Sequence, residues 1–439
     1  MSPFTDHSQR RMLNNEAHAR PPAKIAPPSD VSYLAMLHGA LSLEDDYEIL
    51  ADLIQRSGGS RPEPGHDHYL VTLFRSDEHY PEGIRVKWER HSEFTSYTFI
   101  GAGREDEGFD VTPLSRIVED WLQTLAGERI AGIHLTVRAG PPESVDPNDL
   151  SVRWFKGNPA IGAQIADGGA SAYSDYRIHP DGFSRLVMIE HDMNPRQCGR
   201  MVQRLIELDT YRMLALLALP IAKSLTPFLD ECERELASVT SDMSRGPESA
   251  GRDDRTLLER LVSLEADVQG RELTSHYRFS AAAAYYELVR QRTAELRQKR
   301  VQGYQNFAEF IDRRLAPAMR TCRAVAARQA TLADRTARVT QLLSTRVSVT
   351  LEKQNQELLQ SMNARTTQQL RLQETVEGLS VAAVTYYLVG LVNYMAKGLA
   401  KAGLVGSPVF VTSLSVPVVL IVVALGIKRV KRRIGSDES

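Results

Sequence analysis

The chain has 439 residues, of which 42% are hydrophobic and 25% are charged, and its formal net charge is −2. This length predicts two or three structural units, and the composition excludes wholesale disorder, a collagen and a protein made mostly of membrane spans. The near-neutral charge gives no bulk attraction to nucleic acid. Cys198, Cys232 and Cys322 form no disulfide framework, so we expect a reducing compartment for the soluble part.

The first segment, residues 1–28, is polar and contains four closely spaced prolines. It lacks the apolar stretch of a secretory signal, so we expect no signal peptide. The prolines favour an extended N-terminal arm.

Residues 29–194 have the pattern of an α+β domain. The segments 68–75, 83–90, 93–100 and 130–139 are rich in β-branched and aromatic residues, which is typical of strands. A helix is expected at 113–126 and loops at 61–66 and 140–148. Glycine- and proline-rich turns then separate four further strand-like segments, 151–155, 159–166, 170–178 and 183–192. Strands outnumber helices, so we predict a largely antiparallel or mixed sheet.

From residue 195 the pattern changes to long helices, which predicts a helical domain over 195–345. Pro220 should kink or end the first helix. The stretch 290–346 holds thirteen basic residues against four acidic ones. Stacking aromatic residues are not interleaved through its second half, so we expect contacts with acidic faces of the same protein and no nucleic-acid binding.

Residues 346–378 form a predicted stalk helix that continues into the next segment. Its heptad seam contains Leu351, Asn355, Leu358, Met362, Arg365, Gln369, Leu372, Val376 and Leu379. Such a seam predicts a coiled coil and self-association through the stalk, with its three polar members fixing the register at some cost in stability. An ordinary helix packed on its neighbours is the alternative.

Two uncharged segments, 379–395 and 409–427, flank a short loop at 396–408. Each is close to the ~20 residues that cross a hydrocarbon core, so we predict a C-terminal two-helix transmembrane hairpin in a lipid bilayer. Ser380, Thr385 and Asn393 make the first segment only marginally apolar. They suit a pore-facing position, or a buried or interfacial helix.

The tail, residues 428–439, determines the predicted orientation. Its basic residues are Lys428, Arg429, Lys431, Arg432 and Arg433. Positive charges beside a span remain in the cytoplasm, and two spans return the N-terminal domain to the same side.

Glu89, His91 and Glu93 alternate along a predicted strand, and alternate residues share one face of a strand. Two carboxylates and an imidazole could bind a metal or transfer protons. A hairpin turn near His91 would break this alignment, and a solvated sheet face is the alternative. His66 and His68 form a second candidate metal pair.

No phosphate-binding loop, zinc-protease motif, serine-hydrolase elbow or zinc-type Cys/His spacing is present in the sequence. The sequence therefore identifies no cofactor and no ligand, and we favour a protein that is not an enzyme.

Three segments carry a family resemblance: LNNEAHARPP (13–22), VKWERHSEFTSYTF (86–99) and TYYLVGLVNYMAKGL (385–399). They resemble a bacterial family of uncharacterised membrane-anchored proteins, and the similarity covers nearly the whole chain. The resemblance implies a multi-pass protein of the bacterial inner membrane.

The order of parts is also similar to that of CorA-type magnesium channels, in which a cytoplasmic α/β domain leads through a stalk helix into two spans. The Gly-Met-Asn signature of that family is absent, and residues 390–395 read GLVNYM in its place. Two hypotheses follow. The first is a membrane-anchored scaffold or regulatory protein. The alternative is a CorA-like homo-oligomeric channel whose pore is lined by Ser380, Thr385 and Asn393.

Overall fold

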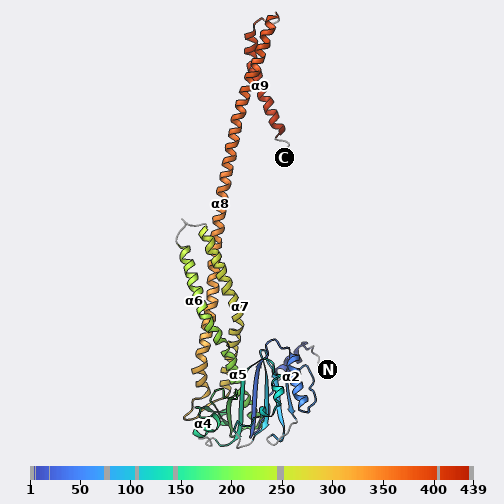
Figure 1. Ribbon diagram of the computed structural model, residues 1–439, viewed down its shortest axis with the longest axis vertical. Helices are drawn as coiled ribbons and strands as arrows, with labels where there is room; N and C mark the ends of the chain where they lie inside the picture. Colours follow the sequence, from blue (N-terminus) through green and yellow to red (C-terminus); the bar gives the residue numbers. More distant parts are fainter. Residues whose placement is uncertain are drawn as a thin grey trace. The chain divides into compact units, whose positions relative to one another are not determined.

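The computed structural model describes residue 4 and residues 6–18, 20–73, 80–103, 108–141, 147–244, 252–402 and 406–434. The chain divides into two compact units (Figure 1). The first comprises Met1–Arg245 and Glu259–Thr340, and the second comprises Gly246–Leu258 and Gln341–Ser439.

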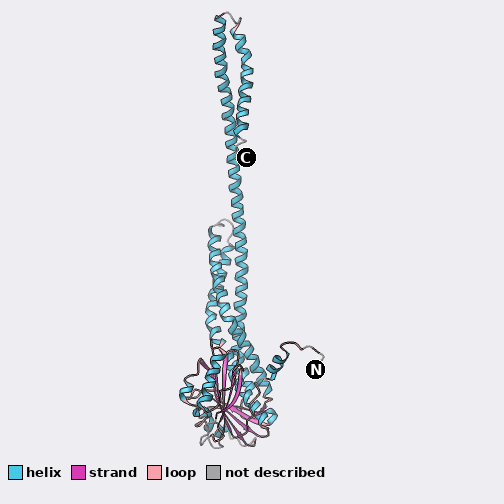
Figure 2. Cartoon of the chain, turned by 90° about the vertical axis from the view of Figure 1, so that its right-hand side faces the viewer, coloured by secondary structure: helices cyan, strands magenta, loops and turns pink. Residues whose placement is uncertain are grey.

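The first unit contains one mixed sheet in the order β2-β3-β4-β1-β5-β8-β7-β6-β9, shown in magenta in Figure 2. β5 and β8 pair in parallel and all the other neighbours pair antiparallel. The strands are β1 (Ser29–Leu37), β2 (His68–Leu73), β3 (Ile84–Arg90), β4 (Phe94–Ala102), β5 (Glu128–Ala139), β6 (Ile161–Ile165), β7 (Ala170–Ser174), β8 (Ser184–Glu190) and β9 (Lys299–Arg300). The N-terminal region is therefore α+β, as predicted.

Short helices accompany the sheet. They are α1 (Arg10–His18), α2 (Leu43–Arg56), η1 (Pro113–Arg116), α3 (Glu119–Leu122), α4 (Pro147–Phe155) and η2 (Ala166–Gly168). α2 begins at a capping box in which the Ser42 hydroxyl accepts a hydrogen bond from the Asp45 N–H. α2, η1 and α3 cover one face of β3 and β4, where Trp88, Phe99 and Trp121 form a buried aromatic core.

Long helices follow: α5 (Pro195–Leu216), α6 (Ala218–Met243), α7 (Arg252–Glu295), α8 (Phe307–Lys401) and α9 (Pro408–Ile434). α5 and α6 are separated at Leu217, and Pro220 lies in the first turn of α6. Proline has no N–H for the carbonyl of Leu216, four residues earlier, so the predicted break at Pro220 is confirmed.

In the part of the chain that the structure describes, three helical stretches are long and apolar enough to cross a membrane, judged by length and composition alone. They lie in Pro195–Met243, Phe307–Lys401 and Pro408–Arg429. In the most apolar part of Pro195–Met243, 33% of the residues are buried. The corresponding share is 6% in each of the other two stretches. Leu214, Ala218 and Leu229 are fully buried in the first unit, which accounts for the apolar character of α5 and α6.

Several predicted elements differ from the structure. The segment 151–155 belongs to α4, where Leu150 and Trp154 lie four residues apart and face one apolar cluster. The expected helix at 113–126 is divided into η1 and α3, because Ile117 between them has an extended backbone.

The N-terminal arm and the predicted C-terminal loop also differ in part. The expected extended arm contains α1, and β1 and α2 were not predicted. α8 continues to Lys401, so it includes the first part of the expected loop at 396–408. Residues 403–405 of that loop, 74–75 of an expected strand and 142–146 of an expected loop lie outside the described residues.

Candidate functional site

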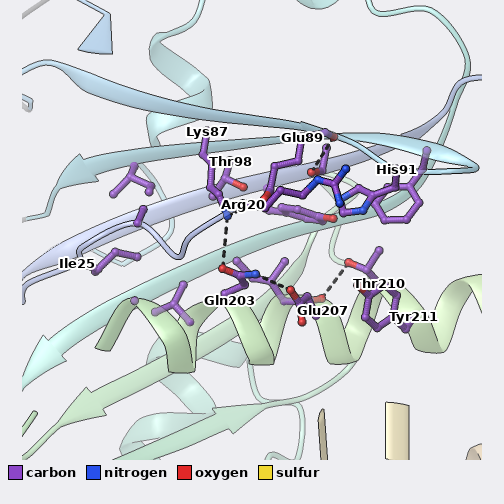
Figure 3. Close-up of a pocket in the computed structure, with 18 residues that line it drawn as sticks. Arg20, Ile25, Lys87, Glu89, His91, Thr98, Gln203, Glu207, Thr210 and Tyr211 are labelled. Atoms are coloured by element: carbon purple, nitrogen blue, oxygen red, sulfur yellow. Dashed lines mark hydrogen bonds and ion pairs between the residues drawn. The ribbon is translucent and has the colours of Figure 1, made fainter. Parts of the chain in front are cut away.

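A cavity of about 290 Å³ lies in the first unit, between the sheet and α5 (Figure 3). Its walls come from three separate parts of the chain: strands β1, β3 and β4, helix α5, and residues 20–25 of the N-terminal arm. This volume is at the lower end of ligand pockets, so the cavity suits a small molecule.

The sheet wall results from strand alternation. Trp88 is directed into the apolar core on one face, so its neighbours Lys87 and Glu89 face the cavity on the other. The register places Lys87 opposite Thr98 of β4, and Thr98 opposite Tyr33 of β1. A row of three polar side chains therefore crosses the floor of the cavity.

The opposite wall is one face of α5. Val202, Gln203, Ile206, Glu207 and Thr210 recur at intervals of one turn and line the cavity. The helix begins at Asn194, whose side-chain oxygen accepts from the N–H groups of residues 196 and 197 at 3.1 and 3.0 Å. This cap fixes the start of the helix that presents these side chains.

The N-terminal arm closes the third side. The Ile25 N–H donates to the Pro195 carbonyl at 3.0 Å, which ties the arm to the start of α5. The arm passes so close to Gly199 that a Cβ built there would lie 1.8 Å from the Ala23 carbonyl oxygen. Only glycine permits this approach. Earlier in the arm, Arg20 lines the cavity and forms an ion pair with Asp67.

Charged and polar side chains link the two walls. Lys87 Nζ lies 2.8 Å from Glu89 Oε1 and donates a long hydrogen bond of 3.4 Å to Gln203 Oε1. Gln203 in turn donates to Glu207 Oε1 at 2.6 Å (Figure 3). Glu207 forms an ion pair with Arg292 of α7. The lining therefore contains two cations, Arg20 and Lys87, and two carboxylates.

Burial shifts the ionisation of several of these groups. Lys87 and Glu89 are each 7% exposed. Burial raises the pKa of Glu89 above its usual value, and the attraction of Lys87 opposes this only in part. Burial, reinforced by Arg20 and Lys87, lowers the pKa of His91 to about 4, so its imidazole is neutral at pH 7. Burial also raises the pKa of Tyr33, which stays a neutral phenol.

A second, more open cavity of about 510 Å³ shares Arg20, His91, Phe94 and Tyr211 with the first. It extends to Tyr285 and Leu288 of α7. The shared residues place the two cavities next to each other.

The structure brings two of the alternating candidates to the cavity and separates the third. Glu89 and His91 line it, whereas Glu93 lies in the β3–β4 turn and contacts Arg278 and Tyr277 of α7. The His91 ring stacks on Phe94 with a centroid distance of 4.3 Å.

The two remaining candidates lie elsewhere. The His66 N–H donates to the Tyr69 hydroxyl at 3.3 Å, and His68 Nδ1 lies 2.9 Å from Asp67 Oδ1. Among the residues that the structure describes, no three His, Cys, Asp or Glu side chains gather as metal ligands.

Sequence reasoning missed Arg20, Lys87, Gln203 and Glu207. One signal for Lys87 was present in the sequence. Lys87 and Glu89 flank Trp88 on a predicted strand, so they lie together on the face opposite the apolar one. Polar residues on α5 gave no such signal, since the solvated face of a helix has the same pattern.

In the second unit, the end of α8 contacts α9. The Thr412 hydroxyl donates to Asn393 Oδ1 at 3.3 Å, and Ala396 and Val423 are buried. Thr385, eight residues before Asn393, is 6% exposed and lies on the same face of α8. Ser380 is exposed and donates to the carbonyl of Val376 at 2.9 Å. Two of the three candidate pore-lining residues therefore lie on the face that contacts α9.

The basic residues that follow belong to the end of α9. Lys428 and Arg429 are exposed, and the side chains of Lys431, Arg432 and Arg433 lie outside the described residues.

Comparison with known proteins assigns the chain to a family. Residues 5–434 match the family described as Protein of unknown function (DUF3422). The chain belongs to this family. No curated protein and no solved structure matches it. The DUF3422 match covers the arm, the cavity and both apolar helices, so these features all lie within the region that defines the family.

Proposed function

We propose that the protein is a membrane-anchored scaffold or regulatory protein. In this proposal the end of α8 and α9 form a two-helix hairpin in the bilayer, and the α+β unit remains on the cytoplasmic side. The observation that carries the proposal is the concentration of exposed apolar side chains on these two helices.

The apolar surface of the helix pair is extensive. Its large exposed side chains include Tyr386, Tyr387, Leu391, Tyr394, Met395, Val409, Phe410, Leu414, Val418, Ile421, Val422 and Leu425. A soluble protein rarely leaves so large a contiguous apolar surface in water. Two of the polar side chains, Asn393 and Thr412, bond to each other across the pair, which satisfies polar groups that hydrocarbon could not.

The orientation rests on charge. Lys428 and Arg429 follow the second apolar helix directly, and the positive-inside rule keeps them in the cytoplasm. A protein with this topology would be a multi-pass component of a bacterial inner membrane.

Self-association through the stalk is part of the proposal. The apolar members of the heptad seam are exposed, with Leu358 at 60% and Leu372 at 71%. A second copy in parallel would cover this seam.

A CorA-like channel remains the second candidate, and its support is the exposed seam that could assemble several copies around an axis. Thr385 and Asn393, however, lie on the face of α8 that contacts α9 of the same chain, whereas a pore lining would need them on the outer face. We therefore favour an anchor over a pore.

Fractionation of cells that produce the protein tests the anchor. The protein should stay in the pellet after carbonate washing and dissolve only in detergent. Protease added outside spheroplasts should leave the α+β unit intact. Recovery of the intact chain in the aqueous supernatant would contradict the proposal.

Liposome reconstitution separates the two candidates. The anchor hypothesis predicts no Mg²⁺ or K⁺ flux above that of empty liposomes. Flux that is altered by Asn393→Ala would favour the channel.

A further inference from the structure

We infer that the cavity between the sheet and α5 binds a compact zwitterion with an apolar side group, of the α-amino-acid type. This inference goes beyond the proposed anchoring role and does not depend on it.

The first argument is charge balance. Arg20 and Lys87 oppose Glu89 and Glu207 around one small space, so the lining is neutral as a whole. Lys87 lies 2.8 Å from Glu89, and Arg20 and Glu207 also pair with Asp67 and Arg292. A ligand with a single charge would meet a like charge at close range in a poorly solvated site. A zwitterion presents a carboxylate to the cations and an ammonium group to the carboxylates, so both of its charges are compensated.

The second argument is unused hydrogen-bonding capacity. Glu89 Oε1 is buried and makes no hydrogen bond of good geometry, although it lies 2.8 Å from Lys87 Nζ. An ammonium donor would satisfy this oxygen. Lys87 has three N–H groups, and its bond to Gln203 is long at 3.4 Å, so it can also accommodate a carboxylate.

The third argument is the distribution of apolar residues. The Cα atoms of Lys87 and Glu89, two positions apart on β3, are about 7 Å apart, and their charged groups approach to 2.8 Å. The two groups that a zwitterion would contact therefore lie side by side. Beyond Lys87, at the end where the arm crosses α5, the lining becomes apolar and consists of Ala23, Ile25, Ile100 and Val202. Figure 3 shows Ile25 at this end and His91 at the other. A ligand with its charged head at Lys87 and Glu89 would direct its side group to the apolar end.

Isothermal titration calorimetry on the full chain in detergent tests the inference with defined probes. These are the L-amino acids alanine, valine, leucine, isoleucine, methionine and phenylalanine. Isocaproate and isoamylamine, which keep the leucine skeleton but lack its ammonium or carboxylate group, serve as single-charge controls. At least one of the amino acids should bind, and both single-charge compounds should bind at least tenfold more weakly than leucine.

A double substitution, Lys87→Met with Glu89→Gln, removes both charges together and avoids leaving one of them buried alone. It should weaken amino-acid binding at least tenfold. The matched control makes the same changes at exposed positions, Lys223→Met with Glu44→Gln, and should bind as the wild type does. Far-ultraviolet circular dichroism and a cooperative melt establish that both variants fold.

Three outcomes would overturn the inference. The first is equal binding of isocaproate or isoamylamine and leucine to the wild type. The second is no binding of any of the six amino acids up to about 10 mM. The third is unchanged binding by the folded double variant. The first two need no variant, so the inference stays testable if the double variant does not fold.

Discussion

Glu93, at the turn between β3 and β4, forms a nearly buried ion pair with Arg278 of α7, 185 residues further along the chain. Tyr277 donates a second hydrogen bond to the same carboxylate at 2.8 Å. Burial opposes ionisation of Glu93, but the hydrogen bonds from Arg278 and its tyrosine neighbours outweigh it and hold the pKa of Glu93 below its usual value. The pair links the sheet beside the cavity to the helical part of the first unit.

Substitution Glu93→Ala should lower the free energy of unfolding of the first unit by about 2–4 kcal/mol, because Arg278 would remain largely buried without this carboxylate. Tryptophan fluorescence during urea unfolding measures this, since Trp88, Trp121 and Trp154 are all buried in that unit. Arg290→Ala is the control. It removes an exposed ion pair with Glu287 and should cost at most about 0.5 kcal/mol. Equal losses from the two substitutions would contradict this interpretation.

Gly199 allows the N-terminal arm to lie against α5. The substitution Gly199→Ala places a methyl group where the Ala23 carbonyl oxygen now lies, so the arm must move away. We expect faster trypsin cleavage after Lys24, measured by mass spectrometry. Gly270→Ala is a matched control, because it is also in a helix and nothing lies within 4 Å of the added Cβ. It should leave cleavage unchanged and favour its helix by about 0.5–1 kcal/mol. Equal cleavage of the two variants would show that the arm is not held at Gly199.

Acid should destabilise the first unit through histidines whose pKa is lowered by partial burial. Burial lowers the pKa of His91 to about 4 from 6.5, so between these values the unfolded state binds the proton more strongly. This contribution to stability is complete above pH 6.5 and is lost as the pH falls to 4, at most about 3 kcal/mol. Arg20, Lys87 and His38 repel the proton and Asp67 attracts it.

The variant His91→Gln isolates this effect. Between pH 7 and 4 it should lose about 2–3 kcal/mol less of its free energy of unfolding than the wild type. His134, whose pKa burial also lowers to about 4, should leave part of the acid sensitivity in place. Parallel stability curves for variant and wild type would contradict the burial of His91.

Periodicity in the sequence located β2, β3, β4 and β5, because alternating β-branched and aromatic residues leave one face apolar. It missed β1, whose segment Ser29–Leu37 includes the helix-favouring run LAML. Residues 151–155 were wrongly predicted as a strand because Val, Trp and Phe favour strands locally. The segment is helical because a helix brings Leu150 and Trp154, four residues apart, into one apolar cluster.

The cavity was less predictable than the sheet. Alternation predicted a shared face for Glu89, His91 and Glu93, of which only the first two line the cavity. The position of Arg20 depends on where the arm crosses α5, and that crossing is determined by Gly199 and the hydrogen bond from Ile25. Gln203 and Glu207 face the cavity only because α5 packs on that side of the sheet. These are tertiary relationships, which no local pattern contains.

The contact between Asn393 and Thr412 offers a direct test of whether the first apolar helix lines a pore. In a background without Cys198, Cys232 and Cys322, the pair Asn393→Cys and Thr412→Cys should form a disulfide within one chain under mild oxidation, because the native side chains meet at 3.3 Å. Mass spectrometry of the digested protein identifies the linked peptides.

Tyr394→Cys paired with Thr412→Cys is the control, since Tyr394 is 77% exposed and lies on another face of α8. It should give no linkage within the chain. The single variant Asn393→Cys should remain monomeric on a non-reducing gel, because α9 covers this position. Residues that face a common pore axis meet their counterparts in neighbouring copies, so efficient dimer formation by Asn393→Cys alone would favour the channel and contradict the anchor.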